Sequence, residues 1–250
     1  MEKRRASRKS INNAFYDELG DLWHTEHAHP IALLRAENRL RIPWIIKTIE
    51  EKLGPHKKIL DIGCGGGFLT NALANAHHEV TGIDLSKESL AIAAKNDVTT
   101  RVIYLQASAE ELPFPSNSFD VVSALDLLEH VEDPAKVVAQ ASKVLKPNGL
   151  FFFHTFNRTL LSYLMVIKGV ELFVPNSPRD MHLLRLFITP KELTTMCETN
   201  AMEVKEIRGM RPSFSKGLLK LILQRHIEEN FQFVFSKSLS TGYCGFATKS

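Results

Sequence analysis

The chain has 250 residues, of which 44% are hydrophobic and 24% are charged, and its formal net charge is +3. These values describe an ordinary globular chain, either one domain or one domain with additions. So small a net charge does not argue for a nucleic-acid partner. Three widely spaced cysteines argue against a disulfide framework or a zinc knuckle and favour a reducing compartment, and no apolar run reaches the roughly 18 residues that span a bilayer.

The N-terminal segment divides into a basic tail and a helical region. Residues 1–10 hold five Lys or Arg, and we interpret them as a solvated tail; the alternative is a tether to anionic lipid, worth about 1 kcal/mol per basic residue. Residues 11–53 carry apolar side chains at helical spacing and predict an N-terminal helical cap. Within it, residues 23–30 hold three histidines and a glutamate, but their spacing matches no common zinc pattern, and Pro30 favours a loop that covers a ligand.

A strand, a tight loop and a helix are predicted around residues 58–68. The apolar run Lys58-Ile59-Leu60-Asp61-Ile62 is followed by Gly63, Gly65, Gly66 and Gly67, and a helical pattern begins at Phe68. Glycines let a backbone loop approach a ligand closely, and free N–H groups at the start of a helix favour anionic ligand groups. The glycine spacing alone does not separate this loop from a dinucleotide-binding loop.

Two acids narrow the choice of ligand. Asp61 lies at the strand end, where a dinucleotide site usually has an apolar residue, and a carboxylate there suits a ligand with an ammonium and a sulfonium. Asp84 ends the next apolar run, at the distance expected of an acid that binds ribose hydroxyls. Together the two acids resemble the first motifs of S-adenosylmethionine-dependent methyltransferases. Asp61 and the absence of a Tyr-x-x-x-Lys pair argue against a nicotinamide-dependent oxidoreductase.

The middle of the chain alternates strands and helices, which predicts a parallel sheet with right-handed crossovers over residues 54–157. Ligands of such sheets bind at the carboxyl ends of the strands, where Asp61, Asp84, Leu125 and Thr155 all fall. The predicted strands span residues 58–62, 79–84, 101–106, 119–125 and 149–155, and the helices span about 67–77, 86–95 and 134–146. We expect Gly149 to follow the end of the last of these helices.

The alternation breaks at residues 158–189. The apolar segment from Leu160 to Val174 is too short to span a bilayer, and it predicts either an ordinary core helix or an amphipathic helix at a membrane interface. Residues 190–250 then complete the sheet, with a helix over 190–200 capped by Thr189, a basic apolar helix over 216–223, and strands over 202–208 and 241–248.

A second group of polar residues follows the fourth strand. Asp126, Glu129 and His130 have the spacing of one helical face, beside the ligand end of the sheet. Methyl transfer to a phenol with a pKa near 10 would need about 4 kcal/mol for full deprotonation at neutral pH. His130 and Glu129 are therefore candidate catalytic residues, either as a base or, with Asp126, as ligands of Mg²⁺; a purely structural role is the alternative.

Three further segments resemble the ubiquinone biosynthesis O-methyltransferases. They are Leu128-Glu129-His130-Val131-x-Asp133-Pro134, Phe153-His154-Thr155-Phe156-Asn157-Arg158-Thr159 and Phe187-Ile188-Thr189-Pro190-x-Glu192-Leu193. The resemblance implies a Rossmann-like class I methyltransferase fold, α/β, with a mostly parallel seven-stranded sheet and helices on both faces. The resemblance places S-adenosylmethionine contacts on Arg41, Gly63, Asp84 and Leu125. Asp61 and Gly65 join this set from the analysis of the glycine loop. The resemblance places metal contacts on Asp126, Glu129 and His130.

The resemblance also implies a substrate and a location. It predicts methylation of a polyprenyl catechol or demethylubiquinol, with residues 158–187 in contact with anionic lipid on the inner, cytoplasmic face of a membrane. Other ubiquinone-biosynthesis proteins are expected partners, and nucleic acid is not. Arg35, Arg39, Leu125 and Asp126 depart from the family pattern, mostly on the substrate side. A methyltransferase of another small lipophilic acceptor and a non-catalytic lipid-binding subunit remain the alternatives.

Overall fold

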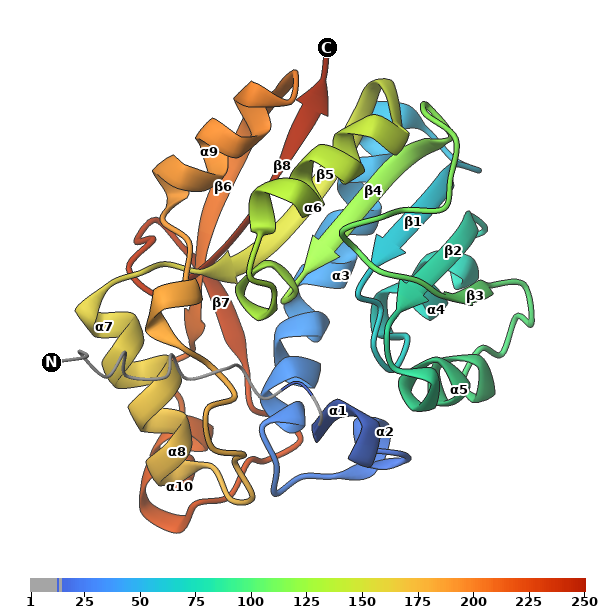
Figure 1. The fold of residues 1–250 in the computed structure, drawn as a ribbon. Coiled ribbons are helices and arrows are strands. Elements are labelled where there is room, and N and C mark those ends of the chain that lie inside the picture. Colours follow the sequence, from blue (N-terminus) through green and yellow to red (C-terminus); the bar gives the residue numbers. More distant parts are fainter. Residues whose placement is uncertain (1–12, 14) are drawn as a thin grey trace, which may run out of the picture.

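The computed structural model describes residues 13 and 15–250, so the basic tail predicted at residues 1–10 lies outside the described residues. One sheet of eight strands runs through the molecule in the order β3-β2-β1-β4-β5-β8-β6-β7 (Figure 1). In chain order the strands are β1 Lys58–Ile62, β2 Glu79–Asp84, β3 Ile103–Gln106, β4 Phe119–Leu125, β5 Leu145–Phe156, β6 Met202–Pro212, β7 Phe233–Ser236 and β8 Gly242–Lys249.

The first five strands are parallel to one another, which confirms the predicted alternation. β8 inserts antiparallel between β5 and β6, and β7 pairs antiparallel with β6 at the edge. The prediction of seven strands was wrong by one. β7 has only four residues, and the prediction missed it although Phe231, Phe233 and Phe235 occupy every second position there, a pattern typical of a strand.

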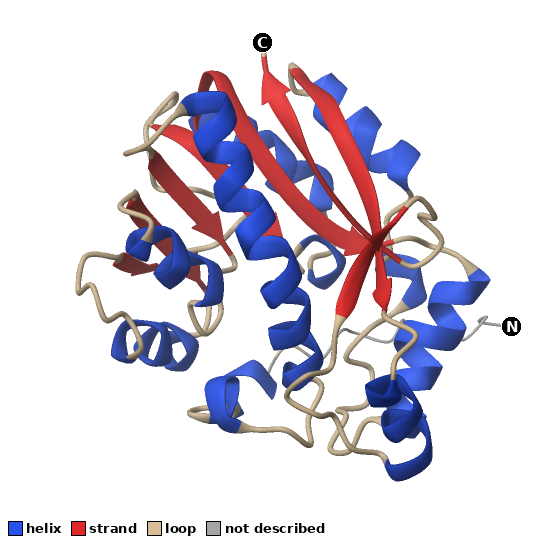
Figure 2. Ribbon diagram, turned by 180° about the vertical axis from the view of Figure 1, so that it is seen from behind, coloured by secondary structure: helices blue, strands red, loops and turns tan. Residues whose placement is uncertain are grey.

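Helices cover both faces of the sheet. On one face, α3 and α4 pack side chains such as Ile45, Ile49 and Leu73 against the strands, and Figure 2 shows the long α3 crossing this face. On the other face, α6 and α9 contribute Val137, Ala141 and Leu193. The α-helices are α1 Phe15–Glu18, α2 Leu22–Thr25, α3 Ile31–Leu53, α4 Phe68–Asn75, α5 Lys87–Lys95, α6 Pro134–Val144, α7 Leu160–Ser162, α8 Val170–Phe173, α9 Pro190–Thr199 and α10 Lys216–Gln224.

The end of α6 differs from the prediction. The helix ends at Val144, and Gly149 lies inside β5 rather than after a helix. The pairing of β4 with β5 shifts register between Phe119 and Val121, and a Cβ at position 149 would lie 2.8 Å from the backbone oxygens of Asp120 and Lys146. Glycine is therefore required by a close backbone approach at an irregularity in the strand.

The cap over α9 agrees with its prediction. The Thr189 hydroxyl accepts a hydrogen bond from the Glu192 backbone N–H, and the Glu192 side chain accepts one from the Thr189 N–H at 2.8 Å. This reciprocal pair is a capping box, and it fixes where α9 begins after residues 158–189.

Two additions lie at the carboxyl end of the parallel strands (Figure 1). One consists of α1, α2 and the start of α3. The other consists of a continuous helix, in which a π-helical stretch Tyr163–Gly169 joins α7 to α8, together with α10. Short 3₁₀ turns, η1 Leu128–His130 and η3 Leu184–Leu186, lie beside them. No helix within residues 13 and 15–250 combines the length and the apolar character needed to cross a bilayer.

Candidate active site

The glycine loop between β1 and α4 forms the floor of a cavity at the carboxyl end of the sheet. Gly63, Gly65 and Gly67 have φ values of +73°, +50° and +84°, a region that disfavours any residue with a Cβ. The Gly63 and Cys64 N–H groups donate to the Ile83 carbonyl at 2.8 and 2.9 Å, which joins the loop to the end of β2.

The Asp84 carboxylate, at the end of β2, binds the backbone of the glycine loop. Its carboxylate accepts hydrogen bonds from the backbone N–H groups of Gly65 and Ser86, both at 2.9 Å. Burial raises the pKa of this carboxyl, while the backbone hydrogen bonds oppose the shift. Asp84 is therefore oriented by the backbone before any ligand arrives, as a ribose-binding acid should be.

Asp61 is buried at the end of β1, where the Ser123 hydroxyl donates to it at 2.7 Å. Burial raises its pKa to about 7, while Ser123 and the charge of Arg41 act in the opposite direction. A cationic ligand group beside Asp61 would stabilise the charged form.

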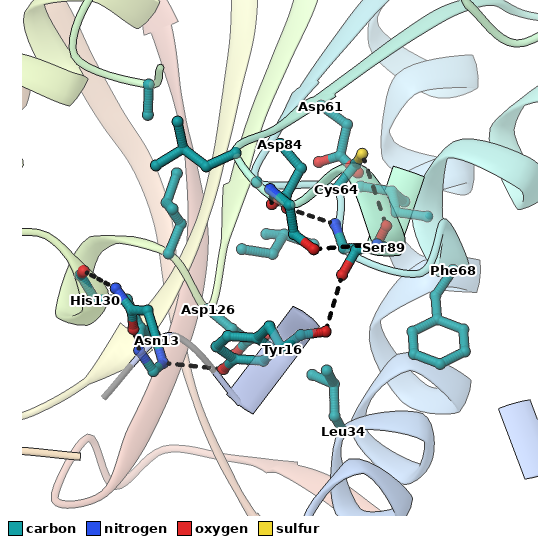
Figure 3. Close-up of a pocket in the computed structure, with 18 of the residues that line it drawn as sticks. Asn13, Tyr16, Leu34, Asp61, Cys64, Phe68, Asp84, Ser89, Asp126 and His130 are labelled. Carbon is teal, nitrogen blue, oxygen red and sulfur yellow. Dashed lines mark hydrogen bonds between the residues drawn. The ribbon is translucent and has the colours of Figure 1, made fainter. Parts of the chain in front are cut away.

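These elements enclose a cavity of about 360 Å³, a volume in the range of small-molecule sites. Figure 3 shows Asp61 and Asp84 on one side of it and His130 with Asn13 on the other. The six residues predicted to contact the cofactor all line this one cavity; they are Arg41, Asp61, Gly63, Gly65, Asp84 and Leu125.

The N-terminal cap covers the glycine loop. Trp23 is buried, and its ring lies so close that a Cβ at Gly65 would be 2.6 Å from it. His24 bonds to the Gly66 carbonyl at 2.9 Å. The segment covers the glycine loop as predicted, but Trp23 and His24 lie in the helix α2 Leu22–Thr25, and the predicted loop is confined to residues 26–30. Among the described residues, the candidate ligand clusters do not include the histidines of this loop.

Asp126 does not join Glu129 and His130, which corrects the predicted ligand set. Its φ is +53°, and this turn directs the carboxylate to the Arg41 guanidinium and to the ring of His154, both of which bond to it. These two partners hold its pKa well below the usual range, against the effect of burial. The helical spacing was misleading because the 3₁₀ turn begins only at Leu128.

Glu129 and His130 lie together with His182, which the sequence did not single out. The ligand atoms of these three side chains lie within 4.8 Å of one another. His182 comes from the insert, residues 158–189, and lies 52 positions after His130. Only the fold therefore brings the two imidazoles together, with ring centroids 5.2 Å apart. Nothing in the sequence around position 182 indicated this contact.

Glu129 is fully buried, and Thr155 donates to its Oε2 at 2.8 Å. Burial and the charge of Asp126 raise its pKa to about 8. His130 is also buried, which lowers its pKa to about 4 and leaves the imidazole neutral at pH 7. Burial likewise lowers the pKa of His182 to about 3.

The orientation of the His130 ring is fixed by Asn13. The Asn13 side-chain NH₂ donates to the His130 carbonyl at 3.0 Å, so its amide oxygen faces the His130 Nδ1 at 3.1 Å. Nδ1 must then carry the proton, and Nε2 is left as an acceptor. The Tyr16 hydroxyl lies 3.4 Å from Nε2, which shows that a phenol fits at this position.

Comparisons with known proteins agree with this geometry. A family model described as "Methyltransferase domain" matches residues 60–153. The chain is 39% identical to the ubiquinone biosynthesis O-methyltransferase of Haemophilus ducreyi over 72% of its length and 77% of that protein. It is 35% identical to that of Hydrogenovibrio crunogenus, over 93% of this chain and 95% of that protein. The chain belongs to the ubiquinone biosynthesis O-methyltransferase family. It is an S-adenosylmethionine-dependent O-methyltransferase.

Solved structures show the same fold at low sequence identity. The magnesium protoporphyrin IX methyltransferase of Synechocystis PCC 6803, solved with bound SAH, aligns with a TM-score of 0.66 at 15% identity, covering 96% of each chain. A methyltransferase from Aquifex aeolicus aligns with a TM-score of 0.59 at 14% identity, covering 95% of this chain and 98% of that one. The class I methyltransferase fold predicted from the sequence is confirmed, with one additional strand.

Proposed function

We propose that the chain transfers a methyl group from S-adenosylmethionine to a ring hydroxyl of a polyprenyl catechol of the demethylubiquinol type. The observation that carries the proposal is that the cavity of the glycine loop ends at Asp126 and His130, where a second, apolar cavity begins. A charged cofactor and a lipophilic acceptor would therefore meet beside a neutral imidazole.

We assign the cofactor contacts from the donors and acceptors in the first cavity. Asp84 would accept from the ribose hydroxyls, and the glycine loop would bind the methionine portion. Among residues 13 and 15–250, the buried Nη1 of Arg41 has no hydrogen-bond partner, which suits the methionine carboxylate. Asp61 would lie near the ammonium, and Leu125 would pack against the adenine or the surroundings of the sulfonium.

We assign the base to His130. An imidazole can accept a proton only in its neutral form, and burial keeps this imidazole neutral at pH 7. The acceptor hydroxyl would take the place beside Nε2 that Tyr16 now occupies and give its proton to Nε2. Its oxygen would bond to the methyl carbon in line as the methyl–sulfur bond breaks, and S-adenosylhomocysteine would leave. Glu129 lines neither cavity, so we assign it a positioning role through Thr155 rather than contact with the substrate.

Mg²⁺ remains a prediction, and the donor set does not favour it. With Asp126 bound to Arg41 and His154, the cluster offers one carboxylate and two imidazoles. Mg²⁺ prefers oxygen ligands, whereas imidazoles suit zinc, copper or iron.

We also propose peripheral contact with an anionic bilayer, with the insert and α10 facing the lipid. Leu160, Leu172 and Leu223 are 73%, 62% and 70% exposed, and α10 also carries Lys216 and Lys220. Flotation with vesicles of phosphatidylglycerol, compared with vesicles of phosphatidylcholine, tests this point. Contact with other proteins of ubiquinone biosynthesis remains a prediction.

The test of the catalytic proposal is mass spectrometry of a prenyl catechol incubated with the protein and S-adenosylmethionine. A gain of one methyl group on oxygen is expected. Methylation of other lipophilic acceptors but not of the catechol would favour the alternative, a methyltransferase that acts on another small lipophilic acceptor. Vesicle binding with no methylation of any acceptor would favour the non-catalytic lipid-binding alternative.

A further inference from the structure

We propose that the second cavity is the binding chamber for the isoprenoid tail of the acceptor; this inference rests on the proposed function. The chamber has a volume of about 350 Å³. It lies between the insert helix, α10 and the start of α3, on the side of His130 away from the glycine loop.

The chamber is continuous with the cofactor cavity. Tyr16, Leu34, Asp126 and His130 line both cavities, so a ligand that places its head at His130 can extend into the chamber. The Tyr16 hydroxyl beside the His130 Nε2 lies at this junction. If a catechol head lies at this junction, its ring substituent can extend only into the apolar chamber.

The polar groups of the chamber gather at its inner end. Glu37 lies within 4.8 Å of Asp126, counted between their ligand atoms, and His182 lies equally close to His130. The remaining wall is largely hydrocarbon or aromatic, and it includes Val170, Phe173, Leu221 and Phe231. One polar end and a long apolar wall match a ligand with a polar ring and a hydrocarbon chain.

The chamber also has an apolar rim. Leu164, Met165 and Ile222 line it and are themselves 52%, 42% and 44% exposed. Exposed large apolar side chains around an opening are typical of a site where a hydrocarbon chain passes to another apolar phase. A tail longer than the chamber could leave through this rim toward a bilayer.

The test compares two soluble acceptors with the same catechol head, one without a tail and one with two isoprene units, in the absence of membranes. The wild-type protein is expected to prefer the prenylated acceptor at least tenfold in kcat/KM. Val170→Trp, and separately Val166→Trp, place an indole in the chamber and should reduce that preference at least fivefold. Activity on the tail-free catechol and affinity for S-adenosylmethionine should change less than twofold.

Leu172→Trp is the matched control, because Leu172 lies on the same helix but does not line the chamber. It should leave the preference unchanged. The proposal is overturned if both filling variants keep the wild-type preference, or if they lose activity equally on both acceptors while remaining folded by circular dichroism.

Calorimetry of the prenylated catechol with the wild-type protein, Val170→Trp and Leu172→Trp separates this inference from the proposed function. If no acceptor is methylated, the proposed function fails, while weaker binding to Val170→Trp alone would still support the chamber. A saturated fatty acid that binds as tightly as the prenyl catechol and displaces it would overturn the assignment to the acceptor tail.

Discussion

The buried Arg41 and the half-buried Asp126 form an ion pair that links the long helix α3 to the end of β4. The pair turns Asp126 away from Glu129 and His130 and holds the guanidinium at the edge of the cofactor cavity. The ion pair has two consequences. Asp126 is no longer directed toward the predicted metal ligands Glu129 and His130, and Arg41 is positioned to bind an anionic ligand group.

We expect Arg41→Lys to weaken S-adenosylmethionine binding about 10- to 100-fold in calorimetry, because an ammonium cannot bind Asp126 and a ligand carboxylate with the same planar fork. Arg39→Lys is the control, since Arg39 donates to the Phe231 carbonyl and does not line the cofactor cavity. Equal affinity in the wild-type protein and Arg41→Lys would remove Arg41 from the cofactor site.

Replacing Asp84 by Asn tests the ribose contact. Hydrogen bonds to charged groups are worth about 1.5–3 kcal/mol, so the dissociation constant should rise about 10- to 100-fold. Asp120→Asn is the matched control at the opposite end of the sheet, where Asp120 accepts from the Lys58 N–H at 2.8 Å. If both variants bind S-adenosylmethionine like the wild-type protein, Asp84 does not hold the ribose.

His130→Gln should reduce kcat about 100-fold or more with little change in cofactor affinity, because the base is lost but the cofactor cavity keeps its shape. His27→Gln, at an exposed histidine of the covering loop, serves as the control. Burial lowers the pKa of His130 to about 4, so the wild-type rate should not fall through protonation of this group between pH 8 and 6. A normal kcat for His130→Gln would leave His130 with a structural role.

Asp61 gives a prediction on stability. Its folded-state pKa of about 7 is above its ordinary value, so the folded protein binds the proton more tightly, and the group's contribution to stability falls as pH rises toward 7. Asp61→Asn removes this dependence. In urea unfolding without ligand, the stability of the variant relative to the wild-type protein should rise by about 2 kcal/mol between pH 5 and pH 7.5. A difference that does not change with pH would contradict the buried, proton-binding state of Asp61.

The sequence predicted the part of the site that is local in the chain. The glycine loop and the two strand-end acids lie within 24 residues, and strand pairing alone brings Asp61 and Asp84 to the same edge. Thr189 was predictable for the same reason, because a capping box depends on residues three positions apart.

The contacts that were missed join distant segments. Asn13 reaches His130 across 117 positions, and His182 reaches it from an insert with no periodic pattern. Asp126 was placed on a helical face, but its positive φ and its pairing with Arg41 depend on tertiary structure. β7 is a different case, because its alternating Phe231, Phe233 and Phe235 are a local strand signal that the prediction did not use.

The most direct test of the central claim is a crystal structure of the protein with S-adenosylhomocysteine and a prenyl catechol. The account predicts the ribose on Asp84, the amino-acid carboxylate on Arg41, and the sulfur facing a catechol oxygen beside the His130 Nε2, with the tail in the apolar chamber. A nucleoside bound outside the glycine loop, or a catechol bound away from His130, would contradict it.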